Sequence, residues 1–230
     1  MKIIAVIPCL NEERTIIDIV RKSSKYVDKV IVVDDQSIDK TVSISIKEGA
    51  KVFQTSGKRG AGKALWLGIR SALKDDADII VTLDGDGQHN PDDIPRLLNF
   101  CSKYDSVIAS RFLDSTTKMP LYRRLGIWLI TFVYNLGSSV KVKDSQCGLR
   151  AFNSYVFKTI SIEDKGFGYS TEVLVKLRQK GYSIKETPCI VYYDKVFGNN
   201  STINPISHGI SVLLDTIKWR FQCEVLRKLN

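Results

Sequence analysis

The sequence lacks the features that mark a membrane-spanning, secreted or disulfide-bonded protein. No apolar run reaches the roughly 18 residues that a spanning helix needs. The N-terminal segment becomes acidic and polar too soon for a signal peptide. The five cysteines are scattered, form no C-x-x-C pair and are odd in number, so they cannot all pair within one chain. We therefore expect reduced thiols in a cytosolic protein, and no zinc site.

Internal repeats, low-complexity tracts and proline-rich linkers are also missing, so 230 residues predict one large domain, or one domain with an appendage. Lysine and arginine total 34 against 25 acidic residues, which gives a net charge of +9. This balance fits a nucleic acid, an anionic membrane surface or a phosphorylated substrate. The basic residues are scattered rather than gathered with aromatic residues, which argues against a nucleic-acid-binding domain.

The sequence does contain an alternation of short apolar runs with helical patterns. We expect strands at residues 2–8, 29–35, 51–54, 78–84 and 106–111. We expect helices from an Asn11 cap to about Tyr26, and at 39–48, 64–75 and 91–104. Because parallel strands are joined by helical crossovers, this order predicts an α/β fold with a mainly parallel sheet flanked by helices.

Acidic and polar side chains gather where the expected strands end. They are Asn11 and Glu12 after the first strand, Asp34 and Asp35 after the second, Asp84, Asp86 and Gln88 after the fourth, and Arg111 after the fifth. In parallel α/β sheets, ligands bind beyond the carboxyl ends of the strands. Packing alone gives no reason for acids at several strand ends, so this pattern predicts a functional site.

Asp84, Asp86 and Gln88 alternate with glycines, which permits a tight turn around a cation. Oxygen ligands of this kind suit Mg²⁺ or Mn²⁺. A calcium-binding EF-hand loop is excluded, because His89 stands where that loop needs glycine and Pro95 where it needs glutamate. The alternative is an ordinary polar turn before a helix.

The segment 57–64, "GKRGAGKA", is one residue short of a nucleotide-binding P-loop. Ala64 stands where the P-loop needs a serine or threonine hydroxyl to ligate Mg²⁺. A P-loop NTPase is therefore disfavoured, and a basic surface turn or a different glycine-rich loop remains.

Six segments, in order, resemble the signatures of the inverting glycosyltransferase family two. More narrowly, they resemble its dolichyl-phosphate mannose synthase and polyprenyl-phosphate hexosyltransferase branch. They are "PCLNEERTI", "VVDDQSIDKT", "RGAGKALWLG", "LDGDGQHNPDDIP", "SRF" and "DSQCGLRAF". The resemblance covers residues 1 to about 200. It implies a GT-A catalytic domain over residues 1–205, a nucleotide-sugar donor, and Mg²⁺ or Mn²⁺ as cofactor.

The resemblance also implies roles for three sets of residues. The nucleotide would be bound by Pro8, Asn11, Glu12, Asp35, Gly60, Gly62, Lys63 and Asp84. The metal that bridges the donor diphosphate would be held by Asp84, Asp86 and Gln88. The acceptor phosphate would be met by Arg111, Arg123 and Arg124. Among these, the residues expected to take part in catalysis are Asp86, Arg111 and Arg124.

A phosphate acceptor is already ionised near neutral pH, so it needs cations for positioning rather than a general base. The arginines therefore favour transfer of a hexose, from a donor of the GDP-mannose or UDP-glucose type, to a dolichyl or polyprenyl phosphate. The alternative is a soluble family-two enzyme that acts on a glycan hydroxyl. The oligomeric state is open.

The apolar run within 121–137 is too short to span a bilayer but suits an interfacial helix, with a buried core helix or a dimer contact as alternatives. Residues 206–230 predict a second amphipathic helix. Together they predict a peripheral protein on the cytoplasmic face of a membrane. Glu172 is expected to open a helix that Gly181 closes. Residues 195–201 depart from the branch's Arg-x-x-Gly-x-Ser-Lys pattern, since lysine replaces the arginine and the final lysine is missing.

Overall fold

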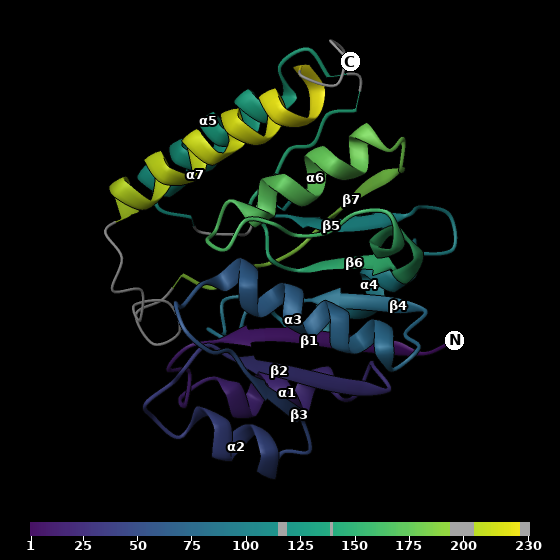
Figure 1. The fold of residues 1–230 in the computed structure, drawn as a ribbon, viewed down its shortest axis with the longest axis vertical. Helices are drawn as coiled ribbons and strands as arrows, with labels where there is room; N and C mark the ends of the chain where they lie inside the picture. Colours follow the sequence, from purple (N-terminus) through teal and green to yellow (C-terminus); the bar gives the residue numbers. More distant parts are fainter. Residues whose placement is uncertain (115–118, 139, 194–204, 226–230) are drawn as a thin grey trace.

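The computed structural model describes residues 1–114, 119–138, 140–193 and 205–225. One seven-stranded sheet, in the order β3-β2-β1-β4-β6-β5-β7, runs through the molecule (Figure 1). The strands are β1 (Ile3–Cys9), β2 (Lys29–Asp34), β3 (Lys51–Gln54), β4 (Ile79–Thr82), β5 (Ser106–Ser110), β6 (Arg150–Asn153) and β7 (Ile184–Pro188). The five strands expected from the sequence are confirmed, and β6 and β7 are added to them.

Strand β6 is antiparallel to both of its neighbours, β4 and β5, whereas every other pair of neighbours is parallel. The mainly parallel sheet that the sequence predicts is therefore confirmed. The reversed strand has a consequence for the site: Arg150, the first residue of β6, pairs with Thr82, the last residue of β4.

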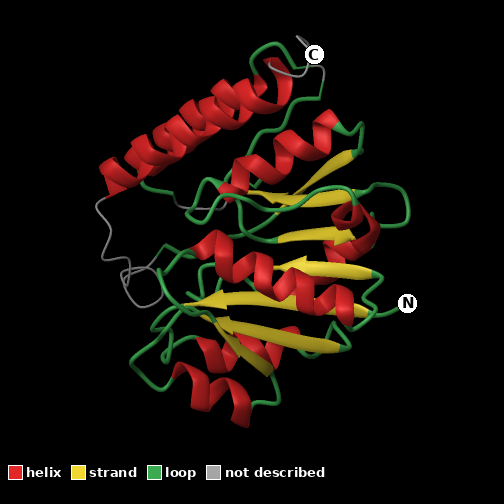
Figure 2. Ribbon diagram, viewed as in Figure 1, coloured by secondary structure: helices red, strands yellow, loops and turns green. Residues whose placement is uncertain are grey.

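Helices cover both faces of the sheet (Figure 2). They are α1 (Ile16–Ser23), α2 (Thr41–Lys47), α3 (Ala61–Lys74), α4 (Ile94–Leu98), α5 (Leu121–Asn135), α6 (Tyr169–Gln179) and α7 (Pro205–Arg220). Side chains alternate along a strand, so Ile4 and Val6 of β1 pack with α3 and α6, and Ala5 and Ile7 pack with α1 and α4. Burial on both faces explains why the first strand is a continuous apolar run.

The helices begin and end up to a few residues from the expected positions, and two of them differ most. Asn11 does not cap the first helix: α1 begins at Ile16, and Asn11 has a φ of 58°, in the left-handed region. The helix expected over 91–104 is shorter, a 3₁₀ turn at Pro91–Asp93 followed by α4. Beyond α4 the chain turns back, and the side-chain amide of Asn153 donates to two backbone carbonyls of this turn. These tertiary hydrogen bonds compete with continuation of the helix.

Helices α5 and α7 lie side by side at one end of the molecule, next to α6 (Figure 1). Helix α7 begins one residue before the expected boundary, and the guanidinium of Arg220 binds the backbone carbonyl of Val133 in α5 at 2.6 Å. Among the described residues, no helix has the length and apolar character needed to cross a bilayer.

Candidate active site

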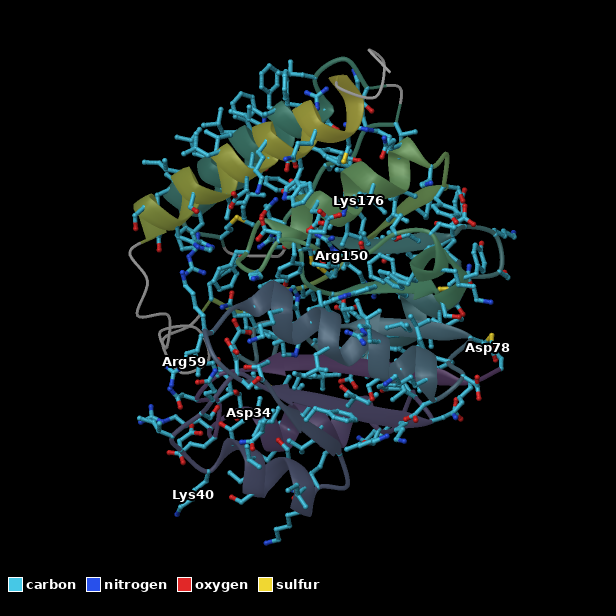
Figure 3. The ribbon with its side chains drawn as sticks, in the orientation of Figure 1. Asp34, Lys40, Arg59, Asp78, Arg150 and Lys176 are labelled. Carbon is cyan, nitrogen blue, oxygen red and sulfur yellow. The ribbon has the colours of Figure 1, made fainter. Side chains whose placement is uncertain are left out.

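The polar side chains singled out above meet at one edge of the sheet. Because β1, β2, β4 and β5 are parallel, their carboxyl ends lie at the same edge, and the reversed strand β6 begins there. Figure 3 shows Asp34 and Arg59 at this edge and Asp78, which precedes β4, at the opposite one. The expectation that the strand ends converge is confirmed.

Asp86 and Gln88 are joined by two hydrogen bonds. The Gln88 backbone N–H donates to Asp86 Oδ1 at 3.0 Å, and its side-chain Nε2 donates to Asp86 Oδ2 at 2.6 Å. Burial, and then the charge of Asp84, raise the pKa of Asp86 to about 6. Burial, and then the charge of Asp86, raise the pKa of Glu12 to about 8. Negative charge is therefore crowded at this point, and a bound cation would relieve it.

The donor set fits a hard divalent cation only in part. Asp84 and Asp86 offer carboxylate oxygens, and Gln88 still has its side-chain carbonyl oxygen. No group of three or more histidine, cysteine, aspartate or glutamate side chains able to hold a metal occurs within the described ranges. Such an ion would therefore need oxygens from water or a bound diphosphate, an arrangement common for Mg²⁺.

No role was predicted for His89 or Gly148, and both lie against the Asp84 carboxylate. The His89 Nε2 atom lies 3.5 Å from Asp84 Oδ2, and His89 is 4% exposed. Burial opposes ionisation of Asp84, but the hydrogen bond and charge of His89 outweigh it and hold the pKa of Asp84 below its usual value. A Cβ atom on Gly148 would overlap the Asp84 carboxylate, so a larger residue there would force that carboxylate to move.

The glycine-rich loop before α3 is held by Asp35. Its Oδ2 atom accepts the Gly60 N–H at 2.6 Å, and its other oxygen accepts the Thr55 hydroxyl. The structure therefore brings together Asp35 and Gly60, which the sequence assigned to nucleotide binding separately.

Gly60 and Gly62 also make close contacts with a distant segment of the same chain. The Gly62 N–H donates to the carbonyls of Lys165 and Gly166, at 3.2 and 3.0 Å. A Cβ atom on Gly60 would overlap the Lys165 carbonyl oxygen, and one on Gly62 would overlap that of Asp164. Small residues are thus required by the approach of residues 164–166 of the same chain. The sequence gives no signal for this contact, because about 100 residues separate the two segments.

Lys63 binds the loop that precedes it. Its Nζ atom binds the backbone carbonyls of Ser56 and Lys58, the latter at 3.3 Å. The ammonium group therefore stabilises the loop that precedes it, because three N–H donors of lysine can satisfy carbonyls that a tight loop leaves unpaired.

The loop after β1 is joined to the loop after β2. The Asn11 N–H donates to the Ser37 hydroxyl at 2.8 Å, and its side-chain oxygen accepts the Ile38 N–H at 2.9 Å. The Glu12 N–H donates to the Thr41 hydroxyl at 2.8 Å. Pro8, near the end of β1, pairs with Val33 of β2. Asn11 and Glu12 thus lie beside the end of β2, and Glu12 also faces Asp86.

Arg111 forms a two-pronged ion pair with Asp144: Nε and Nη2 lie 2.6 and 2.7 Å from the two carboxylate oxygens. Its Nη1 donates to the Tyr193 hydroxyl at 3.2 Å, and the guanidinium of Arg123 lies 5.4 Å from the centre of the Tyr193 ring. Arg111 and Arg123 therefore meet at Tyr193. Arg124 lies on the exposed side of α5. Asp144 and Tyr193 were not predicted, and residues 195–201 lie outside the described ranges.

Comparison with known proteins places this arrangement in a family. The sequence pattern of "Glycosyl transferase family 2" matches residues 4–161. A UDP-N-acetylglucosamine–dolichyl-phosphate N-acetylglucosaminyltransferase of Methanococcus voltae is 32% identical, over 82% of this chain and 84% of its own length. An undecaprenyl-phosphate mannosyltransferase of Micrococcus luteus is 27% identical, over 95% of this chain and 94% of its own length.

Among solved structures, glucosyl-3-phosphoglycerate synthase from Mycobacterium tuberculosis, in complex with Mn²⁺ and UDP-glucose, matches with a TM-score of 0.74 at 21% identity. The match covers 96% of this chain and 79% of that one. At this identity it shows a shared GT-A fold. With the family pattern covering more than half of the chain and the sheet edge built as described, the chain belongs to glycosyl transferase family 2.

Proposed function

We propose that this enzyme transfers a hexose, from a donor of the GDP-mannose or UDP-glucose type, to a dolichyl or polyprenyl phosphate with inversion at the sugar. Mg²⁺ or Mn²⁺ would be required. The observation that carries the proposal is the crowding of Glu12, Asp84 and Asp86 at the carboxyl edge of the sheet. Burial and the neighbouring negative charge raise the pKa of both Glu12 and Asp86 there. Diphosphate binding at such an acidic site needs a cation between the two anions.

On the donor side, Asp84, Asp86 and Gln88 would hold the cation. The solved complex of the structural neighbour with Mn²⁺ and UDP-glucose supports this choice of cofactor. When bound, the ion would neutralise charge that develops on the leaving diphosphate. His89 keeps Asp84 ionised, and Gly148 leaves room for its carboxylate. Asp35 and the glycine loop would then shape the nucleotide side of the site.

On the acceptor side, Arg111 and Arg123 would orient the phosphate. An oxygen of the acceptor phosphate attacks the anomeric carbon, the bond from that carbon to the diphosphate oxygen breaks, and its electron pair leaves with the diphosphate. The acceptor oxygen is already ionised, so no base is needed. The named acceptors of the two relatives, dolichyl and undecaprenyl phosphate, support this class of substrate.

The exposed surface of α5 and α7 supports a peripheral membrane position. It carries large apolar side chains, at Leu121, Leu125, Trp128, Leu129, Phe132, Ile210, Leu214, Ile217 and, directly after α7, Phe221. Both helices lie at the same end of the molecule (Figure 1). We call this surface the apolar face, and we propose that it rests on the cytoplasmic leaflet, where basic residues such as Arg124 favour anionic lipids.

The proposal is tested by transfer from labelled GDP-mannose, UDP-glucose or UDP-N-acetylglucosamine, with Mn²⁺ or Mg²⁺, to either a polyprenyl phosphate or an oligosaccharide. We expect metal-dependent product on the lipid phosphate with one of the hexose donors. Transfer only to oligosaccharides would favour the hydroxyl-acceptor alternative and defeat the lipid assignment.

A further inference from the structure

The segment 163–168, which we call the strap, lies against the glycine loop of the proposed donor site. The Gly62 N–H donates to two carbonyls of the strap, at Lys165 and Gly166. The neighbouring Gly60 N–H donates to Asp35. The position of the glycine loop is thus set from two sides, by Asp35 at the end of β2 and by the strap.

Helix α6 holds the beginning of the strap. The Glu172 carboxylate accepts the N–H groups of Glu163 and Asp164, at 2.8 and 2.9 Å. Lys176, one turn later, lies 2.7 Å from Glu172 and 2.6 Å from Glu163. Glu172 is fully buried, so these contacts satisfy a charge that would otherwise be costly. Glu172 thus has a structural role at the start of α6, as its position in the sequence suggested.

Helix α7 holds the middle of the strap through Trp219. The indole N–H of Trp219 donates to Asp164 Oδ2 at 3.2 Å, while Asp164 Oδ1 accepts the Gly166 N–H at 2.8 Å. Trp219 is 4% exposed, and Lys176 lies 4.9 Å from the centre of its ring. Helix α7 also approaches the end of the strap, where a Cβ atom on Gly168 would overlap Asp215.

These contacts form one chain from the C-terminal helix to the donor site. Trp219 holds the carboxylate of Asp164, that carboxylate fixes the turn at Gly166, and the Gly166 carbonyl receives the Gly62 N–H. We propose that Trp219 is a positioning residue for nucleotide-sugar binding, acting through Asp164 and the strap. The inference rests on the proposed function, because it takes the glycine loop to border the nucleotide.

Two substitutions remove this connection, and the second does so with little change of shape. Trp219→Phe keeps an aromatic ring beside Lys176 but removes the N–H donor. Asp164→Asn keeps the side-chain size but leaves only one oxygen to accept two hydrogen bonds. We expect each to raise the KM for the nucleotide sugar about tenfold, equal to about 1.4 kcal/mol. The kcat should change less than twofold, because lost uniform binding raises KM alone.

The experiment measures binding of GDP and UDP with Mn²⁺ by calorimetry, and KM and kcat for the active donor, in wild type, both single variants and the double variant. Because Trp219 acts through Asp164, the double variant should bind nucleotide no more weakly than Asp164→Asn. Trp66→Phe is the matched control: Trp66 packs against Phe157 at a ring distance of 6.2 Å, outside the strap, and its KM should equal that of wild type.

Equal nucleotide affinity in wild type and Trp219→Phe would overturn the inference while leaving the proposed function standing. Additive effects of the two substitutions would overturn the route through Asp164. A wild-type chain that binds neither nucleotide would overturn the proposed function, and this inference with it. If Trp219→Phe lowers the melting temperature, Asp164→Asn supplies the same test from the other end of the contact.

Discussion

The carboxylate of Asp144 holds the guanidinium of Arg111 in a buried, two-pronged ion pair, with side chains 0% and 9% exposed. Removing one partner of such a pair leaves an uncompensated charge, which typically costs about 3–5 kcal/mol. We therefore expect Asp144→Asn to lower the free energy of unfolding by about that amount, measured by urea denaturation. Lys51→Gln, which breaks the pair of Lys51 (42% exposed) with Asp75 (21% exposed), should change it by less than about 1 kcal/mol, because Asp75 keeps Lys29 as a partner. Equal losses of stability in the two variants would contradict the assignment of Arg111 and Asp144 as a buried ion pair.

Asp86→Asn should lower kcat at least about 100-fold, or about 2.7 kcal/mol in activation free energy, because the cation loses a charged ligand. The same change should leave the cation-free protein as stable as wild type or more so, since it removes a charge that Glu12 and Asp84 repel. A melting curve and a transfer assay on one preparation separate the two effects. Asp18→Asn, at an exposed acid on α1, should leave both unchanged. An Asp86→Asn enzyme with parental kcat would refute the role of this carboxylate.

The stabilisation of the folded protein by a divalent cation should grow as the pH rises from 6 to 8. Folding raises the pKa of Asp86 to about 6 and that of Glu12 to about 8. A carboxyl with a raised pKa favours the folded state while protonated, and this contribution is lost as the pH rises through the folded value. Cation binding needs the ionised forms, so protons compete with it at low pH. The shift in melting temperature caused by Mn²⁺ should therefore be larger at pH 8 than at pH 6. A shift independent of pH would show that these carboxyls do not meet the ion.

Gly148→Ala should weaken cation binding, because the new Cβ atom overlaps the Asp84 carboxylate and forces it to move. We expect the Mn²⁺-induced melting shift to fall by at least half. Gly126→Ala is the control, since nothing lies within 4 Å of a Cβ atom there. In α5 that change should stabilise the protein by about 0.5–1 kcal/mol. A Gly148→Ala protein that responds to Mn²⁺ like wild type would show that Asp84 is not a ligand.

Membrane binding should depend on the apolar face. Trp128, which stacks on Phe132 at 5.6 Å, is 55% exposed on α5. We expect Trp128→Ser to weaken partition into anionic phosphatidylglycerol vesicles about tenfold or more, since burying such a side chain contributes about 1.5–3 kcal/mol. Ile46→Ser, at an equally exposed site on α2 at the far end of the molecule, is the control. Sedimentation with vesicles measures both. If the two variants sediment alike, the face does not meet the bilayer.

Much of the fold could be predicted from the sequence, because its signals are local. The alternation of β-branched runs and helical patterns predicts five of the seven strands and their parallel arrangement. Asp84 and Asp86 stand out because parallel strands end at one edge, so acids that follow several strands must converge. The short strands β6 and β7 carry no clear alternation and were missed.

Only the tertiary structure decided the contacts between distant segments. The reversed strand β6 brings Gly148 to Asp84, and the strap comes to lie on Gly60 and Gly62, although no spacing in the sequence links these residues. The Nζ atom of Lys63 binds the carbonyls of Ser56 and Lys58, a contact that the sequence alone did not indicate. The sequence by itself determined which chemical groups stand at the strand ends, since periodicity and side-chain type are local properties. The tertiary structure decided which partners hold those groups, because such contacts depend on the packing of the whole chain.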